Sequence, residues 1–373
     1  MKDSQTTMYD HSEIKVRLLD TYIQKYLNIL SRAPHISKVH LYDLFCGEGI
    51  YENGGEGSPI IFLKAIKNVF YRNQHQGQKT IPVDCVFNDI KTSKTEKLKR
   101  IIEEKKLHYP SFGDLRFRNI NYTEAIPKVI RQISRLKNEK AFVFIDPYGY
   151  KEVRASHIKS ILDTKRAEVL LFLPTQFMFR FERKGAPEAL LTFIEDLVPK
   201  GMWPNSHTGI DFIENLKSIF REYLGEDHFV DTFIITREKN QYFCLFFFTS
   251  HIYGFDKMLE AKWELDAEEG RGHSIVQPEA LPLFSDPSIK INNKLESFLL
   301  EFLEEPRTNG EIYKAILHLG FKPKHAVDVL KTLYSSSRIS VTPIGRIKIK
   351  KGAFYINYSE FSENPNKVSI QLK

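Results

Sequence analysis

The sequence contains only three cysteines, Cys46, Cys85 and Cys244, and they lie far apart. It has no CxxC pair and no Cys/His cluster, so the pattern excludes a disulfide framework and a zinc site. It also lacks an apolar run of the roughly 18–20 residues that span a bilayer. The first residues, MKDSQTTMYDHSE, lack the apolar centre of a secretory signal. We therefore expect a cytoplasmic protein with no metal and no membrane contact.

Acidic residues are scarce in one C-terminal segment. Residues 306–352 carry ten Lys/Arg against two acids, a balance of +8, whereas the rest of the chain has 44 basic and 45 acidic residues, or −1. The net charge of +7 therefore belongs to this segment, which favours a polyanionic partner such as nucleic acid. The 373 residues are 42% hydrophobic and 27% charged, which is ordinary for two or three globular domains.

Short apolar runs alternate with helical stretches through the first two thirds of the chain. Five such runs separated by helices predict a parallel sheet covered on both faces. Two further runs, joined by residues 237–241, predict an antiparallel hairpin. Seven strands with the last one reversed are typical of an α/β, class I S-adenosylmethionine (SAM) methyltransferase-like fold, whereas a dehydrogenase Rossmann domain has six parallel strands. The predicted strands are residues 39–45, 82–87, 115–120, 141–145, 168–173, 229–236 and 242–249.

The basic segment follows a stretch with three prolines, Pro278, Pro282 and Pro287, and has its own pattern. Three helices and then two short strands predict a winged helix-turn-helix domain. The helices are expected at residues 295–303, 310–319 and 323–333, and the strands at residues 338–341 and 346–350. We expect a methyltransferase-like domain over residues 1–276, with a helical insertion at 175–228, a linker at 277–287, the winged helix at 288–358 and a tail at 359–373. Within the insertion, the aromatic and basic residues 177–183 either cap a substrate cleft or form an amphipathic helix.

The densest motif, residues 42–49, ends the first predicted strand. Gly47 and Gly49 allow a sharp turn and a close backbone approach to a ligand at the carboxyl edge of the sheet. Asp43 can order this loop or, through water, hold the ammonium group of SAM, and Phe45 lies in the same turn. A dinucleotide loop would have a third glycine where Glu52 stands, so SAM is favoured over NAD. The alternative is a tight turn with no ligand.

A second acid, Asp89, follows the second strand. A carboxylate at this place accepts hydrogen bonds from ribose hydroxyls in nucleoside-binding sheets, although it can also cap a helix. At the end of the third strand, Asn119 or Asn121 could bind the adenine amino group. We therefore assign Asp89 to the ribose and Asn121 to the adenine of the cofactor.

A third motif, Asp146-Pro147-Tyr148, ends the fourth strand beside the expected methyl position. An acid or amide, prolines and an aromatic residue occupy this place in methyltransferases that act on adenine or cytosine amines. The carboxylate accepts a hydrogen bond from the exocyclic amine, and the ring stacks on the flipped base. Here one proline is replaced, and a structural turn is the alternative. Cytosine-C5 chemistry is excluded, because it needs a nucleophilic cysteine just beyond the fourth strand, usually after a proline, and this chain has none there.

Several motifs in order resemble the three-Cys-motif partner (TcmP) family over roughly residues 10–270. The resemblance implies a methyltransferase-like fold, a winged helix of a type appended to the family, and a partner protein with a three-cysteine, radical-SAM-like motif. It places Asp43, Gly47 and Gly49 at the methionine end of SAM, Asp89 at the ribose, and Asp146 with Tyr148 on the acceptor side. Leu44 and Cys46 depart from the commoner family pattern. The matching residues are His11, Lys15, Tyr22 and Tyr26, then residues 42–51, 57–59, 144–149 and 247–261, and Trp263.

Two functions stay open. The first is a SAM-dependent methyltransferase acting on nucleic acid, with an exocyclic amine of a base as the favoured acceptor. The second is an inactive SAM- or nucleotide-binding adaptor that docks the three-Cys-motif partner. Acids at all three strand ends favour the enzyme, because an inactive domain has no chemical need for Asp43, Asp89 and Asp146.

The winged helix is expected to supply the phosphate contacts. Period-two alternation on the second strand would place its cations on one face and Ile347 and Ile349 against the core. A solvated surface is the alternative. The predicted nucleic-acid-binding residues are Lys322, Lys324, Lys331, Arg346, Lys348 and Lys350.

Overall fold

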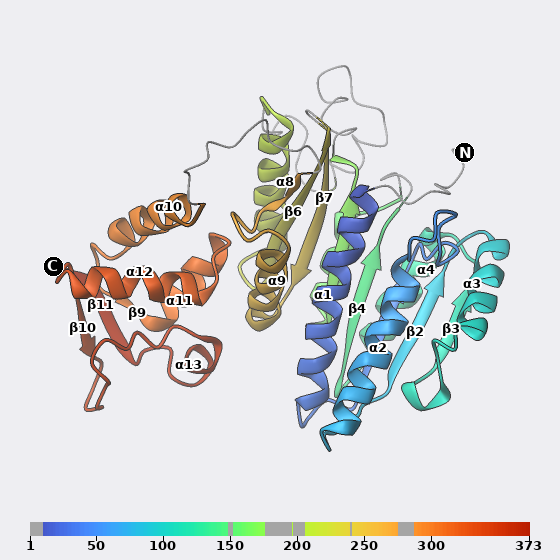
Figure 1. Ribbon diagram of the computed structural model, residues 1–373, viewed down its shortest axis with the longest axis horizontal. Helices are drawn as coiled ribbons and strands as arrows, with labels where there is room; N and C mark the ends of the chain where they lie inside the picture. The colour runs from blue at the N-terminus through green and yellow to red at the C-terminus, as the bar shows by residue number, and fades with distance from the viewer. Residues whose placement is uncertain (1–9, 148–151, 176–195, 197–205, 239–240, 275–286) are drawn as a thin grey trace. The chain divides into compact units, whose positions relative to one another are not determined.

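A computed structural model describes residues 10–147, 152–175, 196, 206–238, 241–274 and 287–373 (Figure 1). The chain divides into two units, Met1–Lys257 with Gly272–Val276, and Met258–Arg271 with Gln277–Lys373. Tyr148 and the aromatic and basic residues 177–183 lie outside the described residues. No helix in the described ranges is both long and apolar enough to cross a membrane.

The first unit is built on one mixed sheet, and the seven predicted strands are all present. β1 to β5 are parallel to one another, and β7 runs antiparallel to both β5 and β6. An eighth strand, β8, pairs with β6 and was not predicted, because three residues show no periodicity. The strands are β1 Lys38–Asp43, β2 Val83–Asn88, β3 Leu115–Arg118, β4 Glu139–Ile145, β5 Ala167–Leu173, β6 Phe229–Glu238, β7 Gln241–Thr249 and β8 Gly272–Ser274. Their order, β3-β2-β1-β4-β5-β7-β6-β8, is that of a class I methyltransferase-like fold with one added strand.

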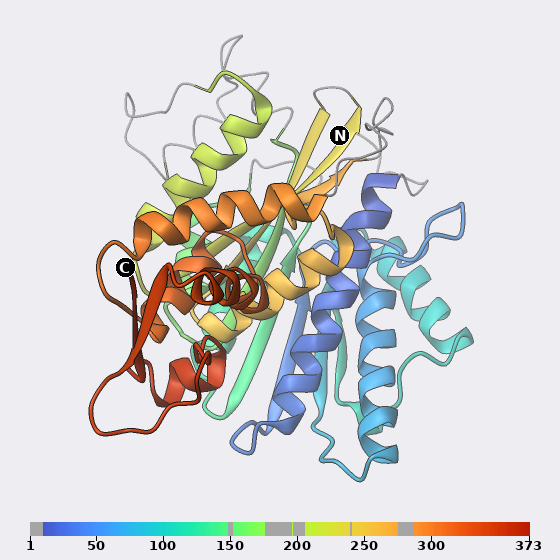
Figure 2. The same ribbon diagram turned by 60° about the vertical axis from the view of Figure 1, so that its left-hand side comes forward.

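Helices cover both faces of this sheet. Helices α1 and α2 run side by side over one face (Figures 1 and 2). On the other face, α4, α5 and α8 enclose an apolar cluster with alternate strand residues such as Tyr42, Val143 and Val169. The helices are α1 Asp10–Arg32, α2 Ser58–His75, α3 Thr92–Glu104, α4 Tyr122–Ile133, α5 Ala155–Leu162, α8 Gly209–Leu224 and α9 Ile252–Leu265, with a 3-10 turn at Pro110–Phe112. Among these, α8 lies in the predicted insertion and begins with a capping box between Thr208 and Asp211.

Helix α1 is fastened to the sheet by buried polar contacts. The hydroxyl of Tyr22 donates a hydrogen bond to Glu168 on β5, and that of Tyr26 donates to the Ala141 carbonyl at 2.9 Å. Thr249 Oγ1 donates to the same Glu168 carboxyl at 3.0 Å. Burial raises the pKa of Glu168 to about 7, although the hydrogen bonds from the two hydroxyl groups act to lower this pKa. A Cβ atom at Gly254 would lie 2.1 Å from Glu168 Oε1, so α9 approaches this carboxyl through a glycine.

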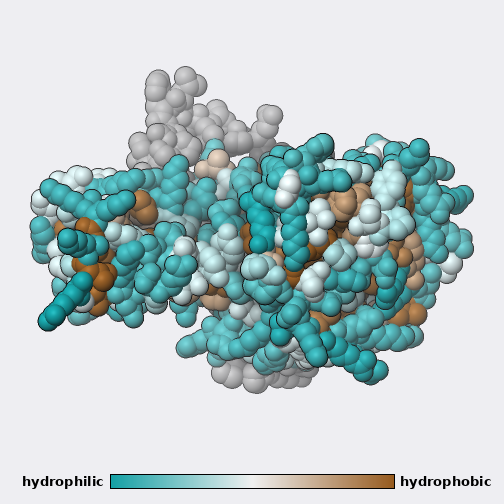
Figure 3. All heavy atoms as spheres, turned by 90° about the horizontal axis from the view of Figure 1, so that it is seen from below, coloured by the Kyte–Doolittle hydropathy of each residue, from teal (hydrophilic) through white to brown (hydrophobic). Residues whose placement is uncertain are grey.

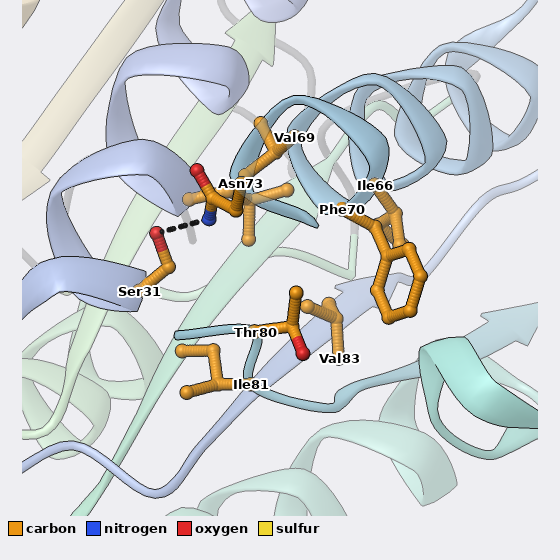
Figure 4. Close-up of a pocket in the computed structure, with 9 residues that line it drawn as sticks. Ser31, Ile66, Val69, Phe70, Asn73, Thr80, Ile81 and Val83 are labelled. Carbon is orange, nitrogen blue, oxygen red and sulfur yellow. Dashed lines mark hydrogen bonds between the residues drawn. The ribbon is translucent and has the colours of Figure 1, made fainter. Parts of the chain in front are cut away.

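A small cavity lies between α1 and α2 near the start of β2 (Figure 4). It encloses about 20 Å³, which is room for one water molecule. Asn73 donates to Ser31 Oγ at 2.9 Å there, and its own buried Oδ1 accepts no hydrogen bond from the described residues. The cavity is at the amino edge of the sheet, opposite the predicted cofactor motifs. Its lining residues are Leu27, Ser31, Ile66, Val69, Phe70, Asn73, Thr80, Ile81 and Val83.

In the described residues, the second unit contains a three-stranded sheet and four helices of its own. The three predicted helices are present, and the first begins earlier than expected. Buried residues from every layer, including Leu299, Tyr313, Leu330 and Ile370, form its core. Its elements are α10 Pro287–Phe302, β9 Arg307–Thr308, α11 Asn309–His318, α12 Pro323–Ser335, β10 Ile339–Pro343, α13 Tyr358–Glu363 and β11 Val368–Leu372, with strand order β10-β11-β9.

The second predicted strand of this unit is wrong. Residues 346–350 have no strand structure, and Ile347 is 42% exposed rather than packed against the core. Gly345, with φ of 81°, turns the chain after β10, and the following segment leaves the sheet as a loop (Figure 2). The partner of β10 is β11, whose Val368 and Ile370 are fully buried. Residues 359–373, expected as a tail, therefore complete the sheet.

Residues Met258–Arg271 also belong to this unit, although the sequence placed them in the first domain. Trp263 Nε1 donates to the Gly320 carbonyl at 2.8 Å, and its ring meets His325 edge-on at 4.3 Å between centroids. These contacts bury Trp263 to 4% exposure. Residues 258–271, which precede the proline-containing stretch 277–287, thus pack on the C-terminal helices through Trp263.

Candidate functional site

The three predicted acids meet at the carboxyl edge of the parallel strands. Asp43, the last residue of β1, is paired in register with Phe87 on β2 and Phe144 on β4. Asp89 and Asp146 each come two residues after these partners, at the same edge. The sheet register therefore brings together side chains that are far apart in the sequence.

Asp43 is fully buried and only partly satisfied. Its Oδ1 accepts the backbone N–H of Phe45 at 3.2 Å, whereas Oδ2 is buried and has no hydrogen-bond partner of ordinary geometry among the described residues. Burial raises the pKa of Asp43 to about 7, although the Ser58 side chain and the Phe45 N–H both favour the charged form. A buried carboxylate oxygen without a donor is costly, so this atom fits a cationic or N–H donor from a ligand.

The glycine turn beside Asp43 has the predicted geometry. Gly47 and Gly49 have φ values of 63° and 83°, in the left-handed region that favours glycine. A Cβ atom at Gly49 would lie 2.5 Å from Leu98 Cδ1, whereas one at Gly47 would meet nothing within 4 Å. Packing therefore requires a glycine at position 49, whereas the space beside the Gly47 backbone is empty and could be occupied by a ligand.

Asp89 is held rigidly at the end of β2. Its Oδ2 accepts the Gly47 N–H at 3.2 Å and the Lys94 ammonium at 3.4 Å, and its Oδ1 accepts the Lys91 N–H at 2.9 Å. A carboxylate offers about four acceptor sites, so capacity remains for a ribose hydroxyl. Asp89 also ties the glycine turn to β2, a structural role that the sequence did not indicate.

Ile90, beside Asp89, is a candidate that the sequence interpretation missed. Its side chain is 56% exposed, the most exposed among the large apolar side chains of the described residues. It presents an exposed apolar surface beside the Asp89 carboxylate. An isoleucine directly after an acid at a strand end was the available signal.

The remaining predicted cofactor contacts lie around the same edge. The Phe45 ring stacks on Tyr122 at 5.4 Å, with the ring planes 19° apart. Asn121 occupies the N-cap position of α4, where it is exposed and its side chain makes no capping hydrogen bond. Asn119 donates instead to the Asp89 carbonyl and to Thr95. Of the two asparagines, Asn121 is therefore the one left available for a base.

Asp146, directly after β4, forms an ion pair with Lys15 from α1. The Lys15 side chain is 7% exposed and that of Asp146 is 21% exposed. Pro147 is buried behind the carboxylate, and Tyr148 lies outside the described residues. The burial of Lys15 excludes a solvated helix face for this residue. The signal was its place on one helical stripe with Leu19, Tyr22 and Tyr26. His11 falls in α1, but its side chain is outside the described part.

Comparison with known proteins gives distant structural similarity only. No protein-family model and no curated protein matches the chain, so the resemblance to the TcmP family stays a prediction. The methyltransferase domain of a bacterial Hen1 protein is 13% identical, with 62% of this chain and 98% of that one covered and a TM-score of 0.30. A putative rRNA methylase from Clostridium thermocellum is 7% identical, with 60% and 93% covered and a TM-score of 0.29. SMU.776, a putative methyltransferase complexed with SAH, is 10% identical, with 60% and 48% covered and a TM-score of 0.29. At these TM-scores we draw nothing about function from the similarity.

The predicted nucleic-acid-binding residues of the second unit differ in their surroundings. Lys322 lies 5.6 Å from the centroid of the Trp263 ring and is half-buried, and Lys331 is within 3.4 Å of Asp328. The other four, Lys324, Arg346, Lys348 and Lys350, are exposed. Because residues 346–350 form a loop, Arg346, Lys348 and Lys350 are not aligned on one face of a strand.

Hydrophobic surface is limited on the face of the molecule seen in Figure 3, which is mainly hydrophilic. Residues 344–352, which follow β10 and carry Arg346, Lys348, Lys350 and Lys351, are called the basic loop. Two of the exposed large apolar residues, Ile344 and Ile347, lie in this loop. Over the described residues, the exposed large apolar side chains are Tyr71, Ile90, Tyr109, Ile210, Leu319, Ile344 and Ile347.

Proposed function

We propose that this protein is a SAM-dependent methyltransferase. The observation that carries the proposal is the buried, unpartnered Oδ2 of Asp43 beside the open backbone of Gly47, at the carboxyl edge of a class I methyltransferase-like sheet. These surroundings match a ligand that has an ammonium group for Asp43, hydroxyl groups for Asp89 and a flat ring for the apolar surface of Ile90. SAM is such a ligand, and when bound it supplies an electrophilic methyl group on a sulfonium ion.

The residues present fit the cofactor along this edge. Asp43 and the Gly47–Gly49 turn would hold the methionine end, with Phe45 packed behind the turn on Tyr122. Asp89 would accept a ribose hydroxyl. Ile90 and Asn121 would contact the base through apolar surface and the amide, respectively.

Asp146, Pro147 and Tyr148 are proposed to form the acceptor side, with an exocyclic amine of a nucleic-acid base as the acceptor. Support comes from the free capacity of Asp146 and from the basic second unit. The exposed cations Lys324, Arg346, Lys348 and Lys350 are suited to phosphate contacts, which position a nucleic acid without reading its sequence. The winged-helix assignment of this unit belongs to the same proposal.

Calorimetric titration with SAM and with NAD tests the cofactor. SAM is expected to bind and to stabilise the fold by about 2.7 kcal/mol at a hundredfold excess over its Kd. Gly47→Val should weaken SAM binding at least tenfold, because a β-branched residue does not adopt φ of 63° and fills the open space. Gly225→Val, at φ of 85° after α8 and also without neighbours within 4 Å, is the matched control and should leave binding unchanged. Binding of NAD without SAM would contradict the assignment.

Nucleoside mass spectrometry after incubation of DNA and RNA with isotope-labelled SAM tests the reaction. Labelled methyl groups on a base amine are expected. Tight SAM binding without transfer to either nucleic acid would instead support the SAM-binding adaptor that docks a partner protein.

The affinity for SAM should depend on pH through Asp43. Its pKa is about 7, and only the ionised carboxylate attracts the ammonium group, so the Kd should fall roughly tenfold between about pH 6 and pH 7.5. The stability of the fold should depend on pH in the opposite direction. Because burial raises the pKa of Asp43, its contribution to the free energy of unfolding is fully present below pH 3.8, the ordinary pKa, and is lost as the pH rises through 7. Calorimetry on Asp43→Asn should give weaker binding with no such pH dependence. An unchanged pH dependence in this variant would assign the titration to another group.

A further inference from the structure

Lys15 is an unusual residue for the first turns of a helix. It lies on α1, its side chain is 7% exposed, and its ammonium group sits 4.5 Å from the centroid of the Phe172 ring. Asp146 is its ion-pair partner among the described residues. Burying an ammonium group costs several kcal/mol, and even a good ion pair often does not repay that cost, so the buried pair calls for a role in the site.

The surroundings keep Lys15 charged. Burial alone would lower its pKa, but Asp146, Tyr51 and Asp43 together outweigh burial and raise the pKa. These groups come from the residue after β4, the loop after β1 and the end of β1, so the cation stands between the proposed cofactor acid, Asp43, and the proposed acceptor acid, Asp146. A charged Lys15 cannot take a proton from the acceptor, which excludes it as a general base.

Helix α1 holds the cation in place. Tyr22 and Tyr26, further along the same helical stripe, anchor the helix to Glu168 and to the Ala141 carbonyl. Lys15 donates to Asp146 Oδ2, and none of the described residues donates to Asp146 Oδ1. The ion pair therefore fixes the plane of the carboxylate and leaves one oxygen for another donor.

We propose that Lys15 is a positioning residue that holds Asp146 through Oδ2, so that Oδ1 accepts the hydrogen bond of the acceptor amine. This inference rests on the proposed methyltransferase function and deepens it. In the step, the acceptor nitrogen forms a bond to the methyl carbon as the carbon–sulfur bond of SAM breaks and sulfur keeps that electron pair. The N–H proton of the amine passes to Asp146 Oδ1 and then to solvent.

Lys15→Met tests the role, because it keeps the length of the side chain and removes the charge. We expect kcat to fall about 10–100-fold, as for a misplaced catalytic group, with the KM for nucleic acid and the Kd for SAM changed less than about threefold. Lys15→Arg, which can still pair with Asp146, should recover part of the loss. Lys38→Met is the matched control, since Lys38 pairs with Asp84 at 3.0 Å at the opposite edge of the sheet and its loss should leave kcat unchanged.

A double-variant cycle and a measurement without cofactor complete the test. In single turnovers, Lys15→Met should change the residual rate of Asp146→Ala less than threefold, since Lys15 acts through Asp146. In the cofactor-free protein, NMR titration of Lys15 should show a lower pKa in Asp146→Asn than in the unaltered protein. The substitution removes the charge that contributes most to raising the Lys15 pKa against the effect of burial. Multiplicative effects of the two substitutions, or an unchanged kcat in Lys15→Met, would overturn the inference. Absence of SAM binding by the unaltered protein would instead overturn the proposed function itself, and with it this role.

Discussion

Replacement of Asp146 with alanine is expected to lower kcat by about 10²–10⁴-fold, the range associated with losing a proton-accepting group. The Kd for SAM should change only a few fold, because the proposed site has Asp146 on the acceptor side and the cofactor held by Asp43 and Asp89. Methyl transfer followed with labelled SAM, together with calorimetry, separates the two effects.

The alanine variant also leaves Lys15 buried without its partner, which destabilises proteins by about 3–5 kcal/mol in comparable cases. The double variant Lys15→Met/Asp146→Ala removes this charge and should restore thermal stability while staying inactive. Normal methylation by either variant would show that residues 146–148 form a turn and that the reaction takes place elsewhere.

Charge reversal of Lys324, Lys348 and Lys350 to glutamate should have the largest effect on nucleic-acid affinity. These three residues are exposed, so each can contact a phosphate. Each lost phosphate contact should reduce the slope of log affinity against log salt by roughly 0.9 for a duplex, and affinity at low salt should fall on the order of a hundredfold. Binding measured over a range of salt concentrations gives both quantities.

The control for this triple variant reverses three exposed lysines of the first unit, Lys128, Lys137 and Lys165. Both triple variants change the net charge by the same amount, so a difference between them reports position rather than total charge. Equal slopes in the two variants would contradict a phosphate-binding role for the basic loop and α12, and would favour protein docking by the second unit.

The main sheet could be predicted because its strands are buried on both faces and appear as separate apolar runs. β8 could not be predicted, because it pairs over only three residues, Gly272–Ser274. The basic loop was misassigned because the alternation of Ile347 and Ile349 with cations imitates a half-buried strand, whereas Val368 and Ile370 take the core positions.

The acids of the site could be predicted for a different reason. Parallel strands end at one edge, so any polar residue just after a strand is brought to the same place, as Asp43, Asp89 and Asp146 are. Their partners could not be predicted in this way. The pairing of Lys15 with Asp146 joins residues 131 positions apart, and it depends on how α1 packs across the sheet.

The buried carboxyl of Glu168 restricts how this sequence can diverge. Gly254 is close enough that any side chain there would occupy the space of the carboxyl, and Tyr22 supplies the hydroxyl that the carboxyl accepts. A homologue with a smaller, apolar residue at position 168 is free to carry alanine at 254 and phenylalanine at 22, whereas a change at one position alone leaves a clash or an unpaired polar group. These three positions should therefore vary together in evolution, and their covariation would identify chains in which α1, β5 and α9 meet as they do here.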